Sequence, residues 1–379
     1  MSEDSYTEVS RQSWFGRLGG AFKGIVVGLI FIIASFVLLF WNEGRAVSTY
    51  KSLKEGASVV VSVGSAEVEL KHEGKLIHLA GQANTNDVLS DQDFGISLNA
   101  IKLKRVVKMY QWEEKEESTT EKDLGGGTTT KKTYTYLKTW ASTLIDSDKF
   151  KKTLGHENPK HMPYVSKELT ATKVTVDAFT LSEGLISKLN DYKPFVLNPS
   201  DMTSIRNGRI VEGGIYVGRG EPNNPIIGDI KIDFQFIAPQ PVSIIAKQFS
   251  GSFTPYLTSN GREIEIIKTG THTAESLFTE AQKENKLLTW VLRIAGFFLM
   301  FIGFTMIFKP LSVVMDVIPF FGNIAETGAG IISFLISGIF SLITIAIAWV
   351  FYRPLLSVPM AAGAIGLLVF LIVKVRKNR

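Results

Sequence analysis

Residues 24–41 read GIVVGLIFIIASFVLLFW and contain no charged side chain. A helix needs about 20 apolar residues to cross the hydrocarbon layer of a bilayer, so this stretch can span a membrane. It lies too far from the start of the chain for a typical secretory signal peptide and lacks a small-residue cleavage site. The stretch therefore predicts a retained transmembrane helix.

Three more apolar stretches follow near the C-terminus, at Leu287–Phe308, Ile331–Tyr352 and Leu355–Val373. The intervening region, 42–286, has the composition of a soluble domain and is long enough to bury its own core. We therefore predict an α+β membrane protein with four transmembrane helices, one N-terminal and three C-terminal, and a large strand-rich extracytoplasmic domain.

The orientation of this arrangement follows from the basic residues beside the spans. Arg11, Arg17 and Lys23 precede the first span, and the last residues read KVRKNR. The positive-inside rule makes both flanks cytoplasmic. The predicted order is a cytoplasmic N-terminus (1–23), a span (24–41), an extracytoplasmic or luminal domain (42–286), a span (287–308), a cytoplasmic interfacial loop (309–330), two spans (331–352 and 355–373) and a basic cytoplasmic tail (374–379).

Composition excludes several classes of function. The chain has 41 Lys and Arg against 36 Asp and Glu, and it has no cysteine. Much of the basic excess lies in the tail, where it is a topology signal, so we expect no nucleic-acid partner. The lack of cysteine rules out disulfides, thiolate metal sites and a cysteine nucleophile.

The sequence carries no recognisable catalytic or cofactor motif. His156 and His161 flank a proline in an expected loop and do not share a helix face at four-residue spacing. No serine lies in a Gly-x-Ser-x-Gly elbow. Pro222 and Pro225 follow the glycines near 218–220, which is incompatible with a phosphate-binding helix start. We therefore expect no enzyme, no metal and no other cofactor.

Glycines recur every four residues in and before the first span, at Gly16, Gly20, Gly24 and Gly28. This spacing puts them along one helix face, where small residues let another backbone approach closely. The face can serve packing within the helix set, which is the commoner use, or self-association.

Aromatic and basic residues mark the expected outer boundary of the membrane. Trp41, Trp290, Trp349 and Tyr352 lie at the ends of spans, where amphipathic rings anchor helices at the interface. Arg293 lies less than two turns into the second span, and no Asp or Glu within the spans can pair with it. An arginine at this depth extends its side chain to the lipid headgroups, so we class it with the anchors.

The segment 309–330 is apolar but contains Pro310, Pro319 and several glycines, which makes it too interrupted for another crossing. Together with Asp316, its aromatic residues Phe320 and Phe321 predict a loop that lies in the cytoplasmic headgroup layer or binds a partner.

The middle region predicts strands and a few short helices. Lys104–Ser118 and Thr133–Ile145 form a long hairpin with a flexible tip at 125–127, and the alternation around Ile230–Phe236 is typical of a half-buried strand. Leu181–Leu189 predicts a short helix with Ser182 as a candidate cap, and Ala274–Lys286 predicts a helix that leads into the second span.

A series of short motifs in a shared order over most of the chain resembles the transmembrane protein 43 family, also called LUMA. The motifs are Asn42-Glu43-Gly44-Arg45-Ala46, Ser52-Leu53-Lys54-Glu55-Gly56, Glu73-Gly74-Lys75-Leu76-Ile77-His78, Met109-Tyr110-Gln111-Trp112, Leu181-Ser182-Glu183-Gly184-Leu185-Ile186 and Phe351-Tyr352-Arg353-Pro354-Leu355. The resemblance implies a four-pass protein with a large luminal or extracytoplasmic domain and no catalytic residues to carry over.

Animal members of that family are similar in sitting in the endoplasmic reticulum and inner nuclear membrane, where they associate with themselves and with envelope proteins. We therefore predict a membrane scaffold that forms a homo-oligomer in the lipid bilayer and organises other membrane or envelope proteins. A transporter or channel component and a lipid- or ligand-binding extracytoplasmic domain are the alternatives. The short tails and the lack of cysteine favour a bacterial inner membrane over the endoplasmic reticulum or inner nuclear membrane.

Overall fold

The computed structural model describes residues 5–198 and 208–354. Their contacts divide the chain into two compact units. Of the described residues, the strand-rich unit contains 5–8, 55–118, 132–198 and 208–278, and the helical unit contains 9–54, 119–131 and 279–354. The predicted fourth span at 355–373 and the basic tail at 374–379 lie outside the described residues.

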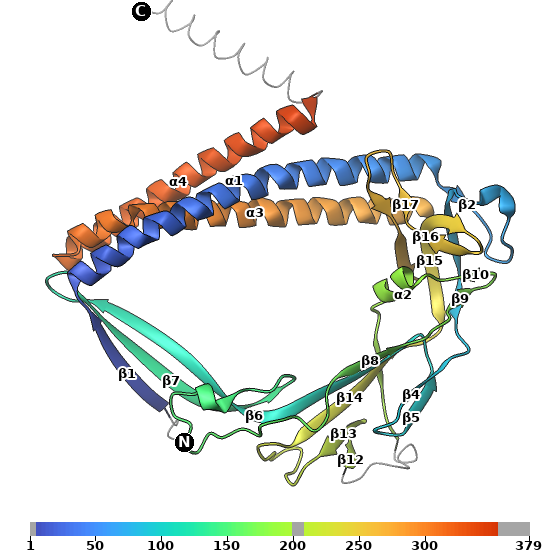
Figure 1. Ribbon diagram of the computed structural model, residues 1–379, viewed down its shortest axis with the longest axis horizontal. Coiled ribbons are helices and arrows are strands. Elements are labelled where there is room, and N and C mark those ends of the chain that lie inside the picture. The colour runs from blue at the N-terminus through green and yellow to red at the C-terminus, as the bar shows by residue number, and fades with distance from the viewer. Residues whose placement is uncertain (1–4, 199–207, 355–379) are drawn as a thin grey trace, which may run out of the picture. The chain divides into compact units, whose positions relative to one another are not determined.

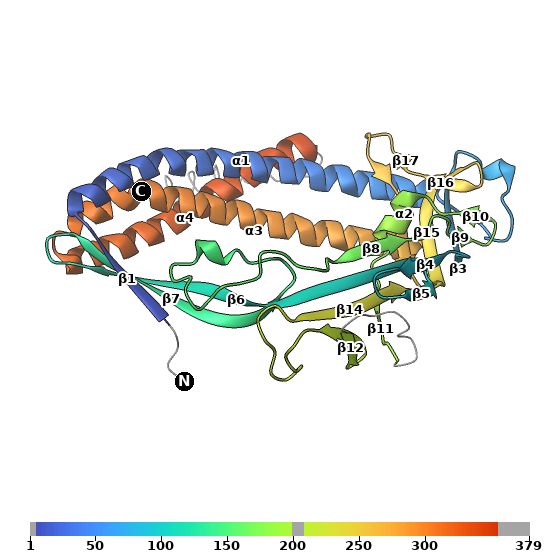
Figure 2. The same cartoon turned by 60° about the horizontal axis from the view of Figure 1, so that its bottom comes forward.

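Three long helices form the helical unit: α1 (Trp14–Val59), α3 (Ala274–Met315) and α4 (Pro319–Tyr352). Each contains an apolar stretch long enough to cross a membrane. They include the predicted spans 24–41, 287–308 and 331–352, so three of the four spans are confirmed as membrane-length helices. Figures 1 and 2 show α1 and α3 running side by side.

Two glycines bring α1 and α3 into backbone contact. A Cβ added at Gly28 would lie 2.6 Å from the carbonyl oxygen of Gly303, and one added at Gly303 would lie 2.8 Å from the carbonyl oxygen of Gly28. No side chain fits between the helices at this point. Small residues at such a crossing allow close van der Waals packing, which drives helix association in lipid.

The predicted loop at 309–330 is wrong as a secondary-structure assignment. Helix α3 continues through Pro310 to Met315, and α4 begins at Pro319, so only Asp316–Ile318 lie between the two helices. Proline is favoured in the first helical turn, where its missing N–H would have no partner, and apolar helices also tolerate an internal proline. The predicted position of this segment in the headgroup layer stays a prediction.

The helical unit also includes residues that were predicted to belong to the extracytoplasmic domain. Residues 42–54 continue α1, and residues 279–286 belong to α3. The predicted helix at Ala274–Lys286 is confirmed and joins the second span without a break.

A seven-stranded sheet in the strand-rich unit has the order β10-β9-β3-β15-β16, with β2 paired to β3 and β19 to β15. Its strands are β2 (Val61–Ser62), β3 (Leu76–Asn84), β9 (Thr175–Val176), β10 (Phe179–Thr180), β15 (Gln240–Phe249), β16 (Ser252–Thr254) and β19 (Ile266–Thr269). Leu79 and Ile244 are register partners in the fully buried core of this sheet. Helix α2 (Glu183–Lys188) adds Leu185 to the same core, and its predicted cap Ser182 accepts the Leu185 N–H.

An eight-stranded sheet has the order β1-β7-β6-β14-β13-β12, with β8 paired to β6 and β11 to β14. Its strands are β1 (Ser5–Gln12), β6 (Lys102–Lys122), β7 (Thr128–Ala141), β8 (Lys167–Thr170), β11 (Lys193–Phe195), β12 (Gly208–Val211), β13 (Gly214–Val217) and β14 (Ile230–Ile237). The alternation predicted for β14 is confirmed, since Ile230, Ile232 and Phe234 are buried. Two further strand pairs are β4 (Val88–Asp91) with β5 (Ile96–Asn99) and β17 (Tyr256–Leu257) with β18 (Glu263–Ile264).

The long hairpin of β6 and β7 is confirmed. Its strands extend further toward the tip than the sequence predicted, so that only residues 123–127 connect them. The tip region, 119–131, belongs to the helical unit.

Candidate functional site

The turn between α3 and α4 holds a buried carboxylate, that of Asp316. Its side chain is fully buried and forms ion pairs with Arg17 of α1 and with Lys122 of β6, whose Nζ lies 2.9 Å from Oδ1. A buried carboxylate is costly to remove from water unless cations and hydrogen bonds compensate. Two cations from distant parts of the sequence therefore meet at this one acid.

Glu326 extends this group along α4, and we call the whole set the turn cluster. Lys122 Nζ lies 2.7 Å from Glu326 Oε2, and Lys309 Nζ of α3 lies 3.0 Å from Glu326 Oε1. Burial acts against the charge of Lys122, but its contacts with Glu326 and Asp316 outweigh that effect and hold the pKa of Lys122 above its ordinary value. Lys122 therefore remains a cation at neutral pH.

The hairpin tip is fixed to the same end of the helices by backbone contacts. Arg17 Nη1 donates to the carbonyl oxygen of Gly126 at 2.5 Å, and the Gly125 N–H donates to the carbonyl oxygen of Val317 at 3.1 Å. Gly126 has a φ of 81°, and a Cβ there would collide with the indole of Trp14. Both the backbone conformation and the available space require glycine at this position.

These contacts do not agree with the predicted topology, which places the residues involved on opposite faces of the membrane. The basic residues predicted that the domain containing Lys122 lies on one face and that Arg17 and Asp316 lie on the other. The structure joins the three residues in one cluster, so the predicted extracytoplasmic placement is not confirmed for the hairpin tip. The physical reason is the buried Asp316, which requires cationic partners that its own turn does not supply.

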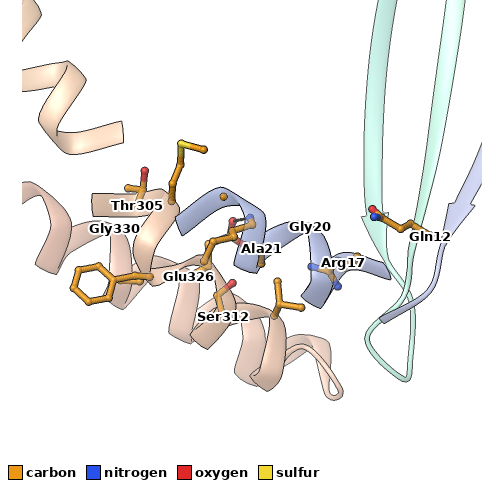
Figure 3. A pocket seen from close by; sticks show the side chains of 14 residues that line it. Gln12, Arg17, Gly20, Ala21, Thr305, Ser312, Glu326 and Gly330 are labelled. Atoms are coloured by element: carbon orange, nitrogen blue, oxygen red, sulfur yellow. Dashed lines mark hydrogen bonds and ion pairs between the residues drawn. The ribbon is translucent and has the colours of Figure 1, made fainter. Parts of the chain in front are cut away.

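A cavity of about 630 Å³ lies beside the turn cluster, between α1, α3 and α4 (Figure 3). We call it the glycine groove, because small residues of α1 and α4 line much of it: Gly20, Ala21, Gly24, Ala329 and Gly330. Ser312 of α3 also lines the groove, and its buried hydroxyl has no hydrogen-bond partner among the described residues. The small residues of the groove thus leave room for another helix to approach the backbone, and the Ser312 hydroxyl is a polar group there without a partner among the described residues.

The predicted glycine face has two different halves in the structure. Gly28 packs directly against Gly303, and a Cβ at Gly24 would come within 3.9 Å of Met306. Among the described residues, a Cβ at Gly20 would meet nothing within 4 Å, and the nearest atoms to one at Gly16 are those of Gln12 and Ser13 at 3.4 Å or more. The later glycines therefore serve packing within the chain, whereas Gly20 borders open space.

A second buried acid, Glu43, lies at the opposite end of the apolar stretches. Its carboxylate accepts hydrogen bonds from Arg293 Nε at 2.6 Å, from Arg293 Nη2 at 3.0 Å and from Trp349 Nε1 at 2.8 Å. This site joins α1, α3 and α4, and we call it the Glu43 site. Arg293 thus has an acidic partner that the sequence did not predict, because Glu43 lies two residues beyond the predicted end of the first span.

Polar contacts continue from the Glu43 site between α1 and α3. Asn42 Nδ2 donates to the carbonyl oxygen of Thr289 at 3.0 Å, and Arg45 Nη1 donates to Asn285 Oδ1 at 2.9 Å. Asn285 in turn donates to the carbonyl oxygen of Ala46 at 3.0 Å. These bonds explain why residues 42–54 belong with the helices.

The predicted interface anchors gather at this end of the bundle. Trp290, Arg293, Trp349 and Tyr352 line one cavity of about 820 Å³, and Trp41 and Tyr352 line a neighbouring one of about 670 Å³. Their role as anchors stays a prediction.

The residues predicted for the interfacial loop lie at the other end, where Asp316 is buried and the side chains of Phe320 and Phe321 are 67% and 49% exposed. Pro319 begins α4.

The two polar sites are separated by similar lengths of each helix. At a rise of 1.5 Å per residue, about 35 Å separates Arg293 of α3 from Asp316, which directly follows that helix. About the same length separates Glu326 from Trp349 in α4, and about 39 Å separates Arg17 from Glu43 in α1. A bilayer is about 30 Å thick in its hydrocarbon core and 40–45 Å with its headgroups. This spacing matches helices that expose an apolar band to lipid and bury charged groups near each interface.

Sequence reasoning missed Glu43, Lys122 and Glu326. Glu43 could have been found by extending the search for a partner of Arg293 past the span boundary, since helices continue beyond their apolar stretch. Lys122 carries no such signal, because its partners are more than 190 residues away along the chain. Among residues 5–198 and 208–354, no group of three or more His, Asp or Glu residues is placed to hold a metal ion.

Comparison with known proteins gives a consistent result over almost the full length of the chain. A model of the family described as Transmembrane protein 43 matches residues 109–354. The chain is similar to Transmembrane protein 43 of Rattus norvegicus, with 34% identity over 95% of this chain and 92% of the relative. It is also similar to that of Homo sapiens, with 34% identity over 94% and 91%. The homolog of Drosophila melanogaster is 30% identical over 87% and 89%.

No solved structure matches the chain. The relatives named above are animal proteins and give no support to the predicted bacterial inner membrane.

Proposed function

Because the chain belongs to the transmembrane protein 43 family, we propose that it is a multi-pass membrane scaffold that associates with a second copy of itself. The oligomer would organise membrane or envelope protein complexes, and we assign the chain no catalytic role. Its apolar helices place it in a lipid bilayer. The bacterial setting stays a prediction from the sequence.

The open side of Gly20 in the glycine groove carries this proposal. At Gly28 the same helix face is filled by α3, but at Gly20 none of the described residues would come within 4 Å of an added Cβ. Small residues from two helices line the groove, so a helix of a second copy can approach the backbone there. The hydroxyl of Ser312 offers that helix a buried hydrogen bond.

The test is the monomer–dimer equilibrium of the full chain in lipid nanodiscs or mild detergent, measured by native mass spectrometry. We expect Gly20→Ile to fill the groove and weaken dimerisation by about 1–2 kcal/mol, or roughly tenfold in dissociation constant. Gly19→Ile is the matched control, because Gly19 is equally open but does not line the groove.

A wild-type chain that stays monomeric in both lipid and detergent would contradict the proposal. So would a Gly20→Ile variant that dimerises as well as Gly19→Ile. Thermal unfolding of each variant shows whether its fold is intact.

A further inference from the structure

The cavity of about 820 Å³ beside the Glu43 site has an unusual set of charges. Residues of α1, α3 and α4 line it, and they include the cations Lys51, Lys286, Arg293 and Arg353 but no Asp or Glu. Arg293 is paired with Glu43. Among the described residues, Lys51 and Lys286 form no ion pair, and the guanidinium of Arg353 lies over the ring of Trp349, 5.7 Å from its centroid. The cavity therefore has an excess of positive charge.

Aromatic residues place this cavity at the depth of lipid headgroups. Trp290 and Trp349 line it at the ends of the apolar stretches of α3 and α4. Tryptophan is enriched where hydrocarbon meets the headgroup layer, because its ring is apolar and its N–H is polar. The opening of the cavity therefore faces the part of a bilayer that contains phosphate groups.

We propose that this cavity binds the headgroup of an anionic glycerophospholipid. Lys51 and Lys286 would contact the phosphate from α1 and α3, and Arg353 would contact it from the position that directly follows α4. The acyl chains would follow the exposed apolar side chains of the helices. A volume of about 820 Å³ lies within the range of pockets that enclose most of a drug-sized ligand, so a headgroup with its glycerol fits.

Charge complementarity selects this occupant. An acidic protein segment would need to reach the cavity past lipid, whereas an anionic lipid is already present at that depth. Basic residues beside a membrane attract anionic headgroups by about 1 kcal/mol each. In this cavity the lysines come from two helices, so their charges are held in a defined arrangement around the headgroup.

The test compares retention of phosphatidylglycerol with that of phosphatidylcholine by the full chain, measured by native mass spectrometry from mixed micelles. We expect the wild-type chain to prefer phosphatidylglycerol and the variant Lys51→Gln plus Lys286→Gln to lose roughly 25-fold of that preference. The matched control is Lys54→Gln plus Lys283→Gln. It removes the same charge from the same two helices, at exposed positions that do not line the cavity.

Three outcomes would overturn the proposal: no preference in the wild-type chain, an equal loss in the control variant, or displacement of the lipid by millimolar inorganic phosphate. The last result would assign the site to a soluble phosphate. Gly20→Ile leaves this cavity unchanged, so failure of the self-association proposal and failure of this one can be told apart.

Discussion

Glu43 and Arg293 form a buried ion pair whose contribution depends on both partners being present. The Glu43 side chain is fully buried, and that of Arg293 is 16% exposed. Removing one partner of such a pair leaves an uncompensated charge, which costs about 3–5 kcal/mol. Replacing both by apolar residues removes that cost.

We therefore expect Arg293→Leu to destabilise the helical unit by about 3–5 kcal/mol and Glu43→Leu plus Arg293→Leu to recover much of the loss. Thermal unfolding of the full chain in detergent measures this, with Lys283→Leu as the control on an exposed position of the same helix. An Arg293→Leu variant as stable as Lys283→Leu would show that the pair contributes little.

At the scale of elements, the glycine spacing could be read from the sequence but its use could not. The four-residue repeat predicted a face for close helix approach, and in the structure Gly28 of that face lies against the backbone of Gly303. Gly28 is the glycine that contacts another helix because Gly303 of α3 lies opposite it. No sequence pattern gives the register between two helices. For the same reason the partners of Asp316 could not be predicted, since they meet only after α1, α3 and the hairpin have packed.

The crossing of α1 and α3 gives a prediction about helix packing. Gly28→Ile would drive a side chain into the backbone of Gly303, and we expect a loss of about 1–3 kcal/mol or more from overpacking. Gly20→Ile is the control for stability, because its added atoms meet open space. Denaturant unfolding in detergent compares the two. Equal stability would mean that the helices do not cross at Gly28.

At the scale of the whole molecule, the turn cluster tests the topology inferred from charge. The sequence predicted three spans and the strand-rich region correctly, because hydropathy and alternation are local signals. Sidedness rests on a statistical rule about basic flanks, and the contacts of Lys122 do not fit it. A polar hairpin tip on the far face of a bilayer could not reach Asp316.

We expect Lys122→Cys plus Glu326→Cys to be joined by a short bifunctional thiol reagent in membranes, because Nζ and Oε2 lie 2.7 Å apart. The chain has no cysteine, so only the introduced pair can react. Lys131→Cys plus Glu326→Cys is the control, with the first cysteine on the same hairpin. If Lys122→Cys and Glu326→Cys are instead labelled from opposite faces, the predicted separation is correct and the contact is absent in the membrane.

The similar spacing of the two polar sites also has a consequence for where the chain can reside. About 35 Å of helix between buried charges fixes the thickness of membrane that the bundle accommodates without strain. In a hydrocarbon layer of about 27 Å the helices must tilt, while in one of about 32–33 Å they stand closer to the membrane normal. This hydrophobic mismatch favours thicker bilayers, so the bundle itself contributes to sorting the protein among membranes that differ by a few ångström.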